Sequence, residues 1–403
     1  MALMKRGLCI GIIIIFFAIG VGTVSAGASL EQGPFAEFRL TPDEAFTETE
    51  YGRSVAIDGD LVAVGAGGDY ANGMVYLYKR QGMIYVFEAN LVNPDGTSEA
   101  EFGRTVAIQG NTVFVGARFA QAGDVSRAGA VYVFRKYGDS WHFEDKIVSP
   151  VPEAEDNFGR ALAVQGSLLV VTARKTVDEE GAAYVFVNKG DTWIHQATLE
   201  AGDPTPGAYF GQSVDIQGDM IVIGARNTDP KGAGGFYLFR KSGDGWTEIT
   251  KITPLNGKKN DQFGFTIAIS GDVITVGARR ADLDTMEDAG AAYVYSVKGD
   301  SVELVTKLTA SDASAFDEFG QSVAFAGDVL AVGAWKDNNK QGSIYLFSRK
   351  GGQWVETNKI TASDGKKGDE FGYSLAAFGN QMVTGAHKAD SGVGAAYVLP
   401  LKQ

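Results

Sequence analysis

The chain has 403 residues, of which 53 are glycine, 45% are hydrophobic and one is cysteine. The many glycines and the lack of any long polar low-complexity run predict a turn-rich globular β protein. The formal net charge of −13 argues against general nucleic-acid binding, which needs basic surfaces that displace counterions from phosphates.

The first 26 residues predict a signal peptide. Lys5 and Arg6 precede an apolar run at residues 7–21, and residues 24–26 place small side chains at a typical cleavage spacing. An uncleaved anchor is the alternative, although a run of about fifteen residues is short for a bilayer that needs roughly twenty. We therefore expect a secreted or cell-surface protein whose mature chain begins near Gly27 and contains no membrane span.

After a flexible lead-in at residues 27–34, the remaining residues, 35–403, repeat one unit seven times. Each copy opens with an aromatic residue followed by glycine, and successive copies are 51 to 56 residues apart. The seven aromatic residues are Tyr51, Phe102, Phe158, Phe210, Phe263, Phe319 and Phe371. A period near fifty residues indicates that the repeats form a propeller or a stacked array. We expect them to make up a single domain.

The copy that begins at Phe319 shows how one unit should fold. Residues 321–326 and 329–332 are apolar or small, and Gly327-Asp328 between them is typical of the tight turn of a hairpin. A third strand is predicted at residues 343–347 and a fourth at residues 354–361, and no helix is predicted after the signal peptide. One four-stranded antiparallel sheet cannot bury both of its faces, whereas seven around an axis can. The sequence thus predicts an all-β fold, a seven-bladed β-propeller of four-stranded antiparallel blades.

The two ends of the repeat region complement each other. Residues 38–43 match residues 307–312, which form the outer strand before Phe319, and so supply an outer strand without a blade. The seventh copy ends at Gln403, before any fourth strand that contains tryptophan. We expect the N-terminal strand to complete the last blade, because this closes the ring and removes an open edge that would promote aggregation.

Several features of the repeat resemble a known family. The aromatic-Gly pair opens the first strand, a Gly-Ala pair such as Gly333-Ala334 ends the second, and a third strand of the type Gly129–Phe134 precedes a strand with a tryptophan such as Trp141. These features resemble the FG-GAP repeats of the integrin α-chain propeller, in the short variety found in exported microbial proteins. The resemblance covers residues 35–403 and implies a binding or adhesion-type propeller.

The sequence departs from the integrin pattern where calcium would bind. In integrin-type repeats, a long acidic loop between the first two strands holds the ion. Here this connection is only a tight turn, as at residues 58–60, 217–219 and 270–272. Such turns offer at most two carboxylates, whereas calcium takes roughly six to eight oxygen ligands. We therefore expect no metal site and no cofactor.

Arginine recurs at two positions of the repeat. It follows the aromatic-Gly pair at Arg53, Arg104 and Arg160, and it follows the alanine that ends the second strand at Arg118, Arg174, Arg226 and Arg279. Trp335 and His387 take the second position in the last two copies. The start of a first strand and the end of a second strand share one rim of a blade, so we expect all nine residues on one face.

Two interpretations of this cluster remain open. Guanidinium groups offer forked donors that suit a carboxylate, phosphate or sulfate, so the nine residues are candidates for ligand binding. The stronger interpretation is ion pairing between neighbouring blades, because acidic residues precede most aromatic-Gly pairs. These acids are Glu99, Glu101, Glu155, Asp156, Asp317, Glu318, Asp369 and Glu370.

Variable rim loops on a rigid scaffold usually carry binding specificity. The longest connections between second and third strands are residues 118–128 and 279–289, and they should open on the same rim as the arginines. The second loop contains Asp282, Asp284, Glu287 and Asp288, which we expect to be solvated acids and not cation ligands.

Catalysis finds little support in the sequence. No motif pairs a serine nucleophile with a base, and the single cysteine, Cys9, lies in the signal peptide. His142 and His195 fall on outer strands, where we expect partly buried sheet residues. The tyrosine that recurs in each third strand indicates packing between blades.

We expect a non-enzymatic, monomeric protein that binds a protein or glycan ligand with its rim loops. The alternative is a polysaccharide-active lyase or hydrolase with a site at the central mouth.

Overall fold

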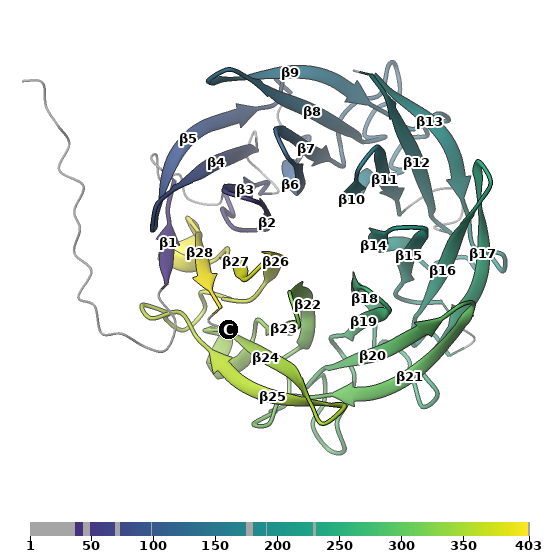
Figure 1. The fold of residues 1–403 in the computed structure, drawn as a ribbon, viewed down its shortest axis with the longest axis vertical. Helices are drawn as coiled ribbons and strands as arrows, with labels where there is room; N and C mark the ends of the chain where they lie inside the picture. Colours follow the sequence, from purple (N-terminus) through teal and green to yellow (C-terminus); the bar gives the residue numbers. More distant parts are fainter. Residues whose placement is uncertain are drawn as a thin grey trace, which may run out of the picture. The chain divides into compact units, whose positions relative to one another are not determined.

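The computed structural model describes residues 37–42, 49–68, 73–97, 99–174, 180–190, 192–228 and 231–401. The signal peptide and the lead-in predicted for residues 1–34 lie outside these residues. Within them, seven four-stranded antiparallel sheets surround one axis, with the first strand of each blade innermost (Figure 1). The predicted seven-bladed β-propeller is confirmed.

The blades follow one another along the chain. Blade 1 comprises β2 (Ser54–Asp58), β3 (Leu61–Ala66), β4 (Met74–Gln81) and β5 (Ile84–Val92). Blade 2 comprises β6 (Phe102–Gln109), β7 (Thr112–Ala117), β8 (Ala130–Tyr137) and β9 (Ser140–Ile147). Blade 3 comprises β10 (Phe158–Gln165), β11 (Leu168–Ala173), β12 (Ala182–Lys189) and β13 (Thr192–Leu199). Blade 4 comprises β14 (Phe210–Gln217), β15 (Met220–Ala225), β16 (Gly235–Ser242) and β17 (Gly245–Ile252).

The last three blades also contain four strands each. Blade 5 comprises β18 (Phe263–Ser270), β19 (Val273–Ala278), β20 (Ala291–Lys298) and β21 (Ser301–Leu308). Blade 6 comprises β22 (Phe319–Ala326), β23 (Val329–Ala334), β24 (Ser343–Lys350) and β25 (Gln353–Ile360). Blade 7 comprises β26 (Ser374–Phe378), β27 (Gln381–Ala386), β28 (Ala395–Pro400) and the N-terminal strand β1 (Phe38–Leu40).

The aromatic-Gly pair is explained by the contact between adjacent blades. Phe319 is fully buried in a hydrophobic cluster with residues of blade 5 such as Val294. Within blade 6 its ring meets that of Tyr345 edge-to-face with 5.5 Å between ring centroids. Gly320 has a φ of +92°, and a Cβ added there would lie 2.4 Å from the carbonyl oxygen of Ala291 in blade 5. Only glycine allows both this backbone conformation and this close approach.

The ring is closed as the sequence predicted. β1 pairs antiparallel with β28, with Phe38 opposite Val398 and Leu40 opposite Ala396 (Figure 1). Leu40 is buried in a hydrophobic cluster formed by blades 1 and 7. The first and last segments of the propeller are therefore joined in one sheet.

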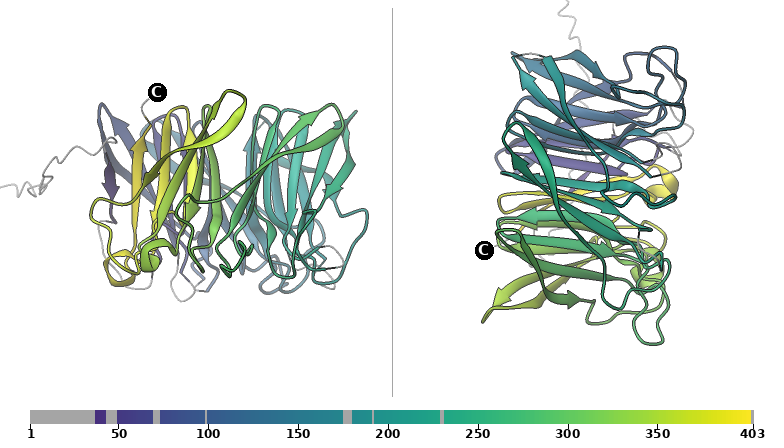
Figure 2. Two further views of the ribbon diagram at one scale, coloured as in Figure 1. Left: turned by 90° about the horizontal axis from the view of Figure 1, so that it is seen from below. Right: turned by 90° about the vertical axis from the view of Figure 1, so that its right-hand side faces the viewer.

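Two short helices differ from the expectation of no helix. α1 (Asp337–Lys340) and α2 (Ala389–Gly392) are single turns between the second and third strands of blades 6 and 7. Both contain residues with left-handed φ, such as Asn338 and Asp390, which tolerate this conformation better than most residues. The longer connections gather at the same end of the propeller as these helices, the lower end in Figure 2 (left), which we call the loop end. Of the residues described, no helix is long and apolar enough to cross a membrane.

Asp215 in β14 links two neighbouring inner strands and should make stability depend on pH. Its carboxylate accepts a hydrogen bond from the Ile269 backbone N–H of blade 5 at 2.8 Å, and burial raises its pKa to about 6. Because this pKa lies above the ordinary value of 3.8, the folded state binds the proton more tightly than the unfolded state. The contribution of Asp215 to stability should therefore rise as the pH falls from about 6 to about 4.

The substitution Asp215→Asn should remove this contribution while keeping an oxygen acceptor. We expect the free energy of unfolding, measured in urea at pH 4.5 and 7.5, to change less with pH in the variant than in the wild type. Equal pH dependence in both proteins would contradict the role of Asp215.

Candidate functional site

Three positions of each blade lie together at the loop end of the inner strands. The residue after the aromatic-Gly pair is Arg53, Arg104, Arg160, Gln212, Phe265, Gln321 or Tyr373 in blades 1 to 7. The residue after the second strand is Gly67, Arg118, Arg174, Arg226, Arg279, Trp335 or His387. The residue before the aromatic is Glu50, Glu101, Asn157, Tyr209, Gln262, Glu318 or Glu370. We call these residues the axial cluster, and it contains all nine predicted site residues.

The residue before each aromatic has an unusual backbone conformation. Its φ lies between 51° and 64° in all seven blades, in the left-handed region that residues other than glycine rarely adopt. In blades 1, 2, 6 and 7 this residue is a buried glutamate. The repeated turn thus places four carboxylates within the axial cluster.

Glu101 accounts for two of the arginines. Its carboxylate receives Nε of Arg118 at 2.5 Å and Nη2 at 2.6 Å, a forked pair, and lies 3.3 Å from Nε of Arg104. Glu101 precedes β6, Arg104 lies within β6 and Arg118 follows β7, so all three belong to blade 2. This ion pairing therefore lies within one blade, whereas the prediction was pairing between neighbouring blades.

Glu318 does cross a blade boundary. It is 1% exposed and lies 3.3 Å from Arg279 of blade 5, while Trp335 Nε1 donates to it at 2.9 Å. Lys336 forms a further ion pair at 2.5 Å. In blade 1, Glu50 pairs with Arg53 and, across the closure of the ring, with Lys388 of blade 7.

Most of the other acids predicted to pair with the arginines do not reach the axial cluster. Glu155 pairs with Arg127 at the surface. Three aspartates instead accept backbone N–H groups three residues earlier, which stabilises the turn that precedes each blade. They are Asp156, Asp317 and Asp369, with partners Glu153, Ser314 and Lys366. For these four residues the predicted pairing is wrong, because the turn holds each side chain among loop residues.

Arg160 and Arg174 differ from the paired arginines. The equivalent of Glu101 is Asn157 in blade 3 and Tyr209 in blade 4, so no carboxylate is supplied. Among the residues described, neither Arg160 nor Arg174 has a carboxylate within ion-pair distance. Arg174 only approaches Gln212 Oε1 at 3.5 Å, and the buried Nε of Arg160 has no hydrogen-bond partner.

The local charge around these two arginines is strongly positive. Burial and the neighbouring Arg174 and Arg104 lower the pKa of Arg160 well below its ordinary value. Burial and Arg226 lower the pKa of Arg174 to about 10. Arg174 and Arg226 both contact the ring of Tyr209, with 5.0 and 4.7 Å from Cζ to its centroid. This side of the axial cluster therefore favours a negatively charged group.

Tyr373 is a central residue that the sequence interpretation missed. Its ring lies 4.0 Å from that of His387 and 5.5 Å from that of Trp335, measured between centroids. Burial raises the pKa of its hydroxyl, but nearby arginines, Arg53 and Arg104 foremost, lower it below the usual value overall. The sequence could have identified Tyr373, because it follows an aromatic-Gly pair in the same position as Arg53, Arg104 and Arg160.

His387 and Glu370 form a buried pair beside Tyr373. His387 Nε2 lies 3.2 Å from Glu370 Oε2. Burial lowers the pKa of His387 well below its ordinary value and raises that of Glu370 to about 7. Burial therefore favours the neutral form of each group.

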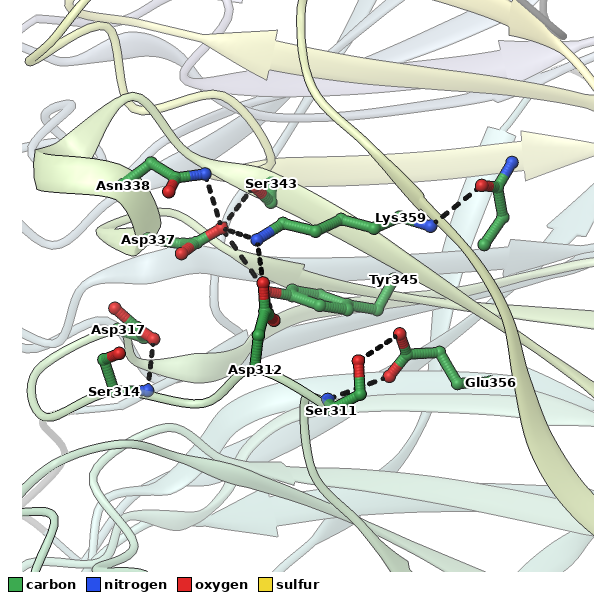
Figure 3. Close-up of polar contacts among 11 residues, drawn as sticks. Ser311, Asp312, Ser314, Asp317, Asp337, Asn338, Ser343, Tyr345, Glu356 and Lys359 are labelled. Atoms are coloured by element: carbon green, nitrogen blue, oxygen red, sulfur yellow. Dashed lines mark hydrogen bonds and ion pairs between the residues drawn. The ribbon is translucent and has the colours of Figure 1, made fainter.

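The repeated tyrosines pack between blades, as predicted. Tyr345 donates to Asp312 at 2.8 Å, and Lys359 binds the other oxygen of that carboxylate at 2.7 Å (Figure 3). Asp312 follows the last strand of blade 5, whereas Tyr345 and Lys359 belong to blade 6. The same arrangement occurs in blades 2, 4 and 7, as Tyr132-Asp95-Lys146, Tyr237-Asp203-Lys251 and Tyr397-Asp364-Arg39.

The two outer-strand histidines correct a minor expectation. His142 and His195 are both exposed rather than partly buried. The residues opposite them, Arg135 and Phe186, belong to the third strands. Among the residues described, no further strand pairs with the outer edge of these fourth strands.

Comparison with known proteins adds one match. A family model described as FG-GAP repeat matches residues 36–78, 85–134, 141–186, 193–239, 246–295, 302–347 and 354–399. No curated protein matches the chain.

Proposed function

Because this chain belongs to the FG-GAP repeat family, we propose that it is an exported, non-enzymatic protein that binds a protein or glycan ligand at the loop end of its propeller. The adhesion-type role rests on analogy with the integrin propeller alone. The chemistry of the ligand follows from the axial cluster. We propose that the ligand presents a carboxylate or sulfate group to Arg160 and Arg174.

One observation carries this proposal. Charges withdrawn from water are normally paired, because an isolated charge loses its hydration without compensation. Arg53, Arg104, Arg118 and Arg279 have glutamate partners, whereas Arg160 and Arg174 have no carboxylate among the residues described. An anionic group on a ligand would supply the missing partner. The neighbouring loop at residues 118–128 would then contribute to specificity.

The double substitution Arg160→Glu and Arg174→Glu tests the proposal. The wild type should bind a member of an array of uronate-bearing glycans, sulfated glycans and acidic peptides. The affinity of the variant for the same member should be at least tenfold lower. Glutamates among the remaining arginines should be tolerated, so the melting temperature should not fall.

The matched control is Lys241→Glu with Lys298→Glu, which makes the same change in charge at exposed residues near hairpin turns. This control should bind as the wild type does. Unaltered binding by the Arg160 and Arg174 variant would refute the proposal.

A second candidate is a lyase that acts on acidic polysaccharides. The lowered pKa of Tyr373, its contact with His387 and the surrounding arginines favour it. In such a reaction, arginine neutralises the uronate carboxylate, a base removes the adjacent proton, and the glycosidic oxygen leaves with a proton to give a double bond. An activity assay distinguishes the two candidates. Polysaccharides that contain uronate are incubated with the protein, and the ultraviolet absorbance of the new double bond is followed. A product that is lost in Tyr373→Phe would favour the lyase.

A further inference from the structure

Blade 5 contains an incomplete copy of the Tyr-Asp-cation arrangement. In blades 2, 4, 6 and 7 an aspartate carboxylate bridges a tyrosine hydroxyl and a Lys or Arg side chain. In blade 5 the tyrosine is Tyr293 and the cation is Lys307, which lie directly opposite each other on β20 and β21. The position of the aspartate is taken by Asn256, a neutral residue.

The backbone around Asn256 matches that around the aspartates. Gly257 N–H donates to the Pro254 carbonyl at 3.1 Å, and Gly96 N–H donates to the Asn93 carbonyl at 3.1 Å in the turn that carries Asp95. Asn256 therefore occupies the same place in the same turn. The carboxylate is lost through the side chain and not through a change in the fold.

The tyrosine and the lysine keep their relative positions. Lys307 Nζ lies 5.6 Å from the centroid of the Tyr293 ring, compared with 5.0 to 5.4 Å for the lysines of blades 2, 4 and 6. Within the part of the chain that the structure describes, the Tyr293 hydroxyl and the Lys307 ammonium have neither a hydrogen bond nor an ion pair. Tyr293 is partly exposed, whereas its four equivalents in the complete arrangements are buried.

A cavity open to solvent borders Asn256 and Lys307. Its volume is about 610 Å³. Its polar lining comprises Asn256, Lys258, Asp282, Asp284, Lys307, Thr309 and Ser311. The hairpin at residues 282–286 forms another wall and contributes the apolar side chains Leu283 and Met286. The volume falls within the range of roughly 300 to 1,000 Å³ that is usual for small-molecule sites.

We propose that this cavity binds a small monoanionic ligand through a carboxylate, which takes the place of the aspartate carboxylate found in blades 2, 4, 6 and 7. One carboxylate oxygen accepts the Tyr293 hydroxyl and the other accepts the Lys307 ammonium. The rest of the ligand lies against Thr309, Ser311 and the hairpin at residues 282–286.

The charges of the lining favour one negative charge over two. Lys258 lies 3.1 Å from Asp282, so that pair largely neutralises itself. Asp284 adds a further negative charge to the wall. A phosphate dianion would meet these acids, whereas a single carboxylate needs only Lys307. The cavity, Tyr293 and Lys307 belong to the third and fourth strands and their loops, and they do not include any residue of the axial cluster.

The substitution Asn256→Asp is the sharpest test, because it restores the internal carboxylate. Isothermal titration would use D-glucuronate and N-acetyl-L-isoglutamine, whose single carboxylate is that of the glutamate side chain, with D-glucose and N-acetyl-L-glutaminamide as neutral probes. At least one acid should bind the wild type, the neutral probes should not, and affinity should fall at least tenfold in Asn256→Asp and in Lys307→Met. The acid that binds distinguishes a sugar acid from an acidic amino acid as the ligand.

Stability measurements keep this test independent of folding. Asn256→Asp should raise the melting temperature by about 2 °C, because it completes an ion pair. The matched change Asp203→Asn, which removes the carboxylate from blade 4, should lower it. Binding of neither acid to the wild type, or equal binding to Asn256→Asp, would overturn the proposal.

Discussion

A chain that lacks residues 35–50 is expected to unfold or aggregate. The deletion removes β1, so β28 loses its outer neighbour and exposes unpaired backbone groups at a sheet edge. It also removes buried Leu40, the ion pair from Arg39 to Asp364, and Glu50, which pairs with Lys388. Losing a buried leucine alone costs about 2 to 5 kcal/mol, a large part of the stability of a typical domain.

Size-exclusion chromatography and thermal melting would check this prediction. The milder variant Leu40→Asp keeps the backbone of β1 but buries a charge, and it should lower the melting temperature without removing the strand. A truncated chain that stays monomeric with an unchanged melting temperature would contradict the role of β1 in closing the ring.

Glu318→Ala is expected to lower the free energy of unfolding by about 3 to 5 kcal/mol. Removing this carboxylate leaves Arg279, Lys336 and the Trp335 N–H without their shared acceptor in a site where Glu318 is only 1% exposed. The cost is large because the remaining charges stay withdrawn from water. Urea unfolding at neutral pH measures it.

The control is Glu303→Ala. Glu303 pairs with Lys298 at the surface, where the two side chains are 60% and 71% exposed. Exposed pairs of this kind contribute about 0.2 to 1 kcal/mol, so this variant should be nearly neutral. Equal losses in the two variants would show that Glu318 does not organise the axial cluster.

The fold could be predicted because its determinants repeat. Phe319 and Gly320 serve one contact between blades, and the same steric need recurs seven times with a fixed period. The strand boundaries also followed from the turn at Gly327-Asp328, since a tight turn fixes where two strands meet. The two one-turn helices could not be predicted, because four residues with left-handed members carry no helical periodicity.

The candidate site could be predicted only in part. The arginines were found because they recur, whereas their partners depend on one residue before each aromatic, which is Glu101 in blade 2 but Asn157 in blade 3. Tyr373 was missed because it occurs once. The substitution at Asn256 was visible in the sequence, but only the pairing of Tyr293 with Lys307 shows what that position does in the other blades.

The closure of the ring also sets the order in which the chain can fold. β1 cannot pair until β28 has been synthesised. The ion pair between Arg39 and Asp364, which are 325 positions apart, shows how far apart in sequence these contacts are. Contacts of such high sequence separation form late, because the intervening chain must first lose its freedom. Blades 1 to 6 can therefore assemble while the chain is still emerging, and the N-terminal strand remains exposed until β28 is complete. During this delay the unpaired edge of the last blade is most open to aggregation.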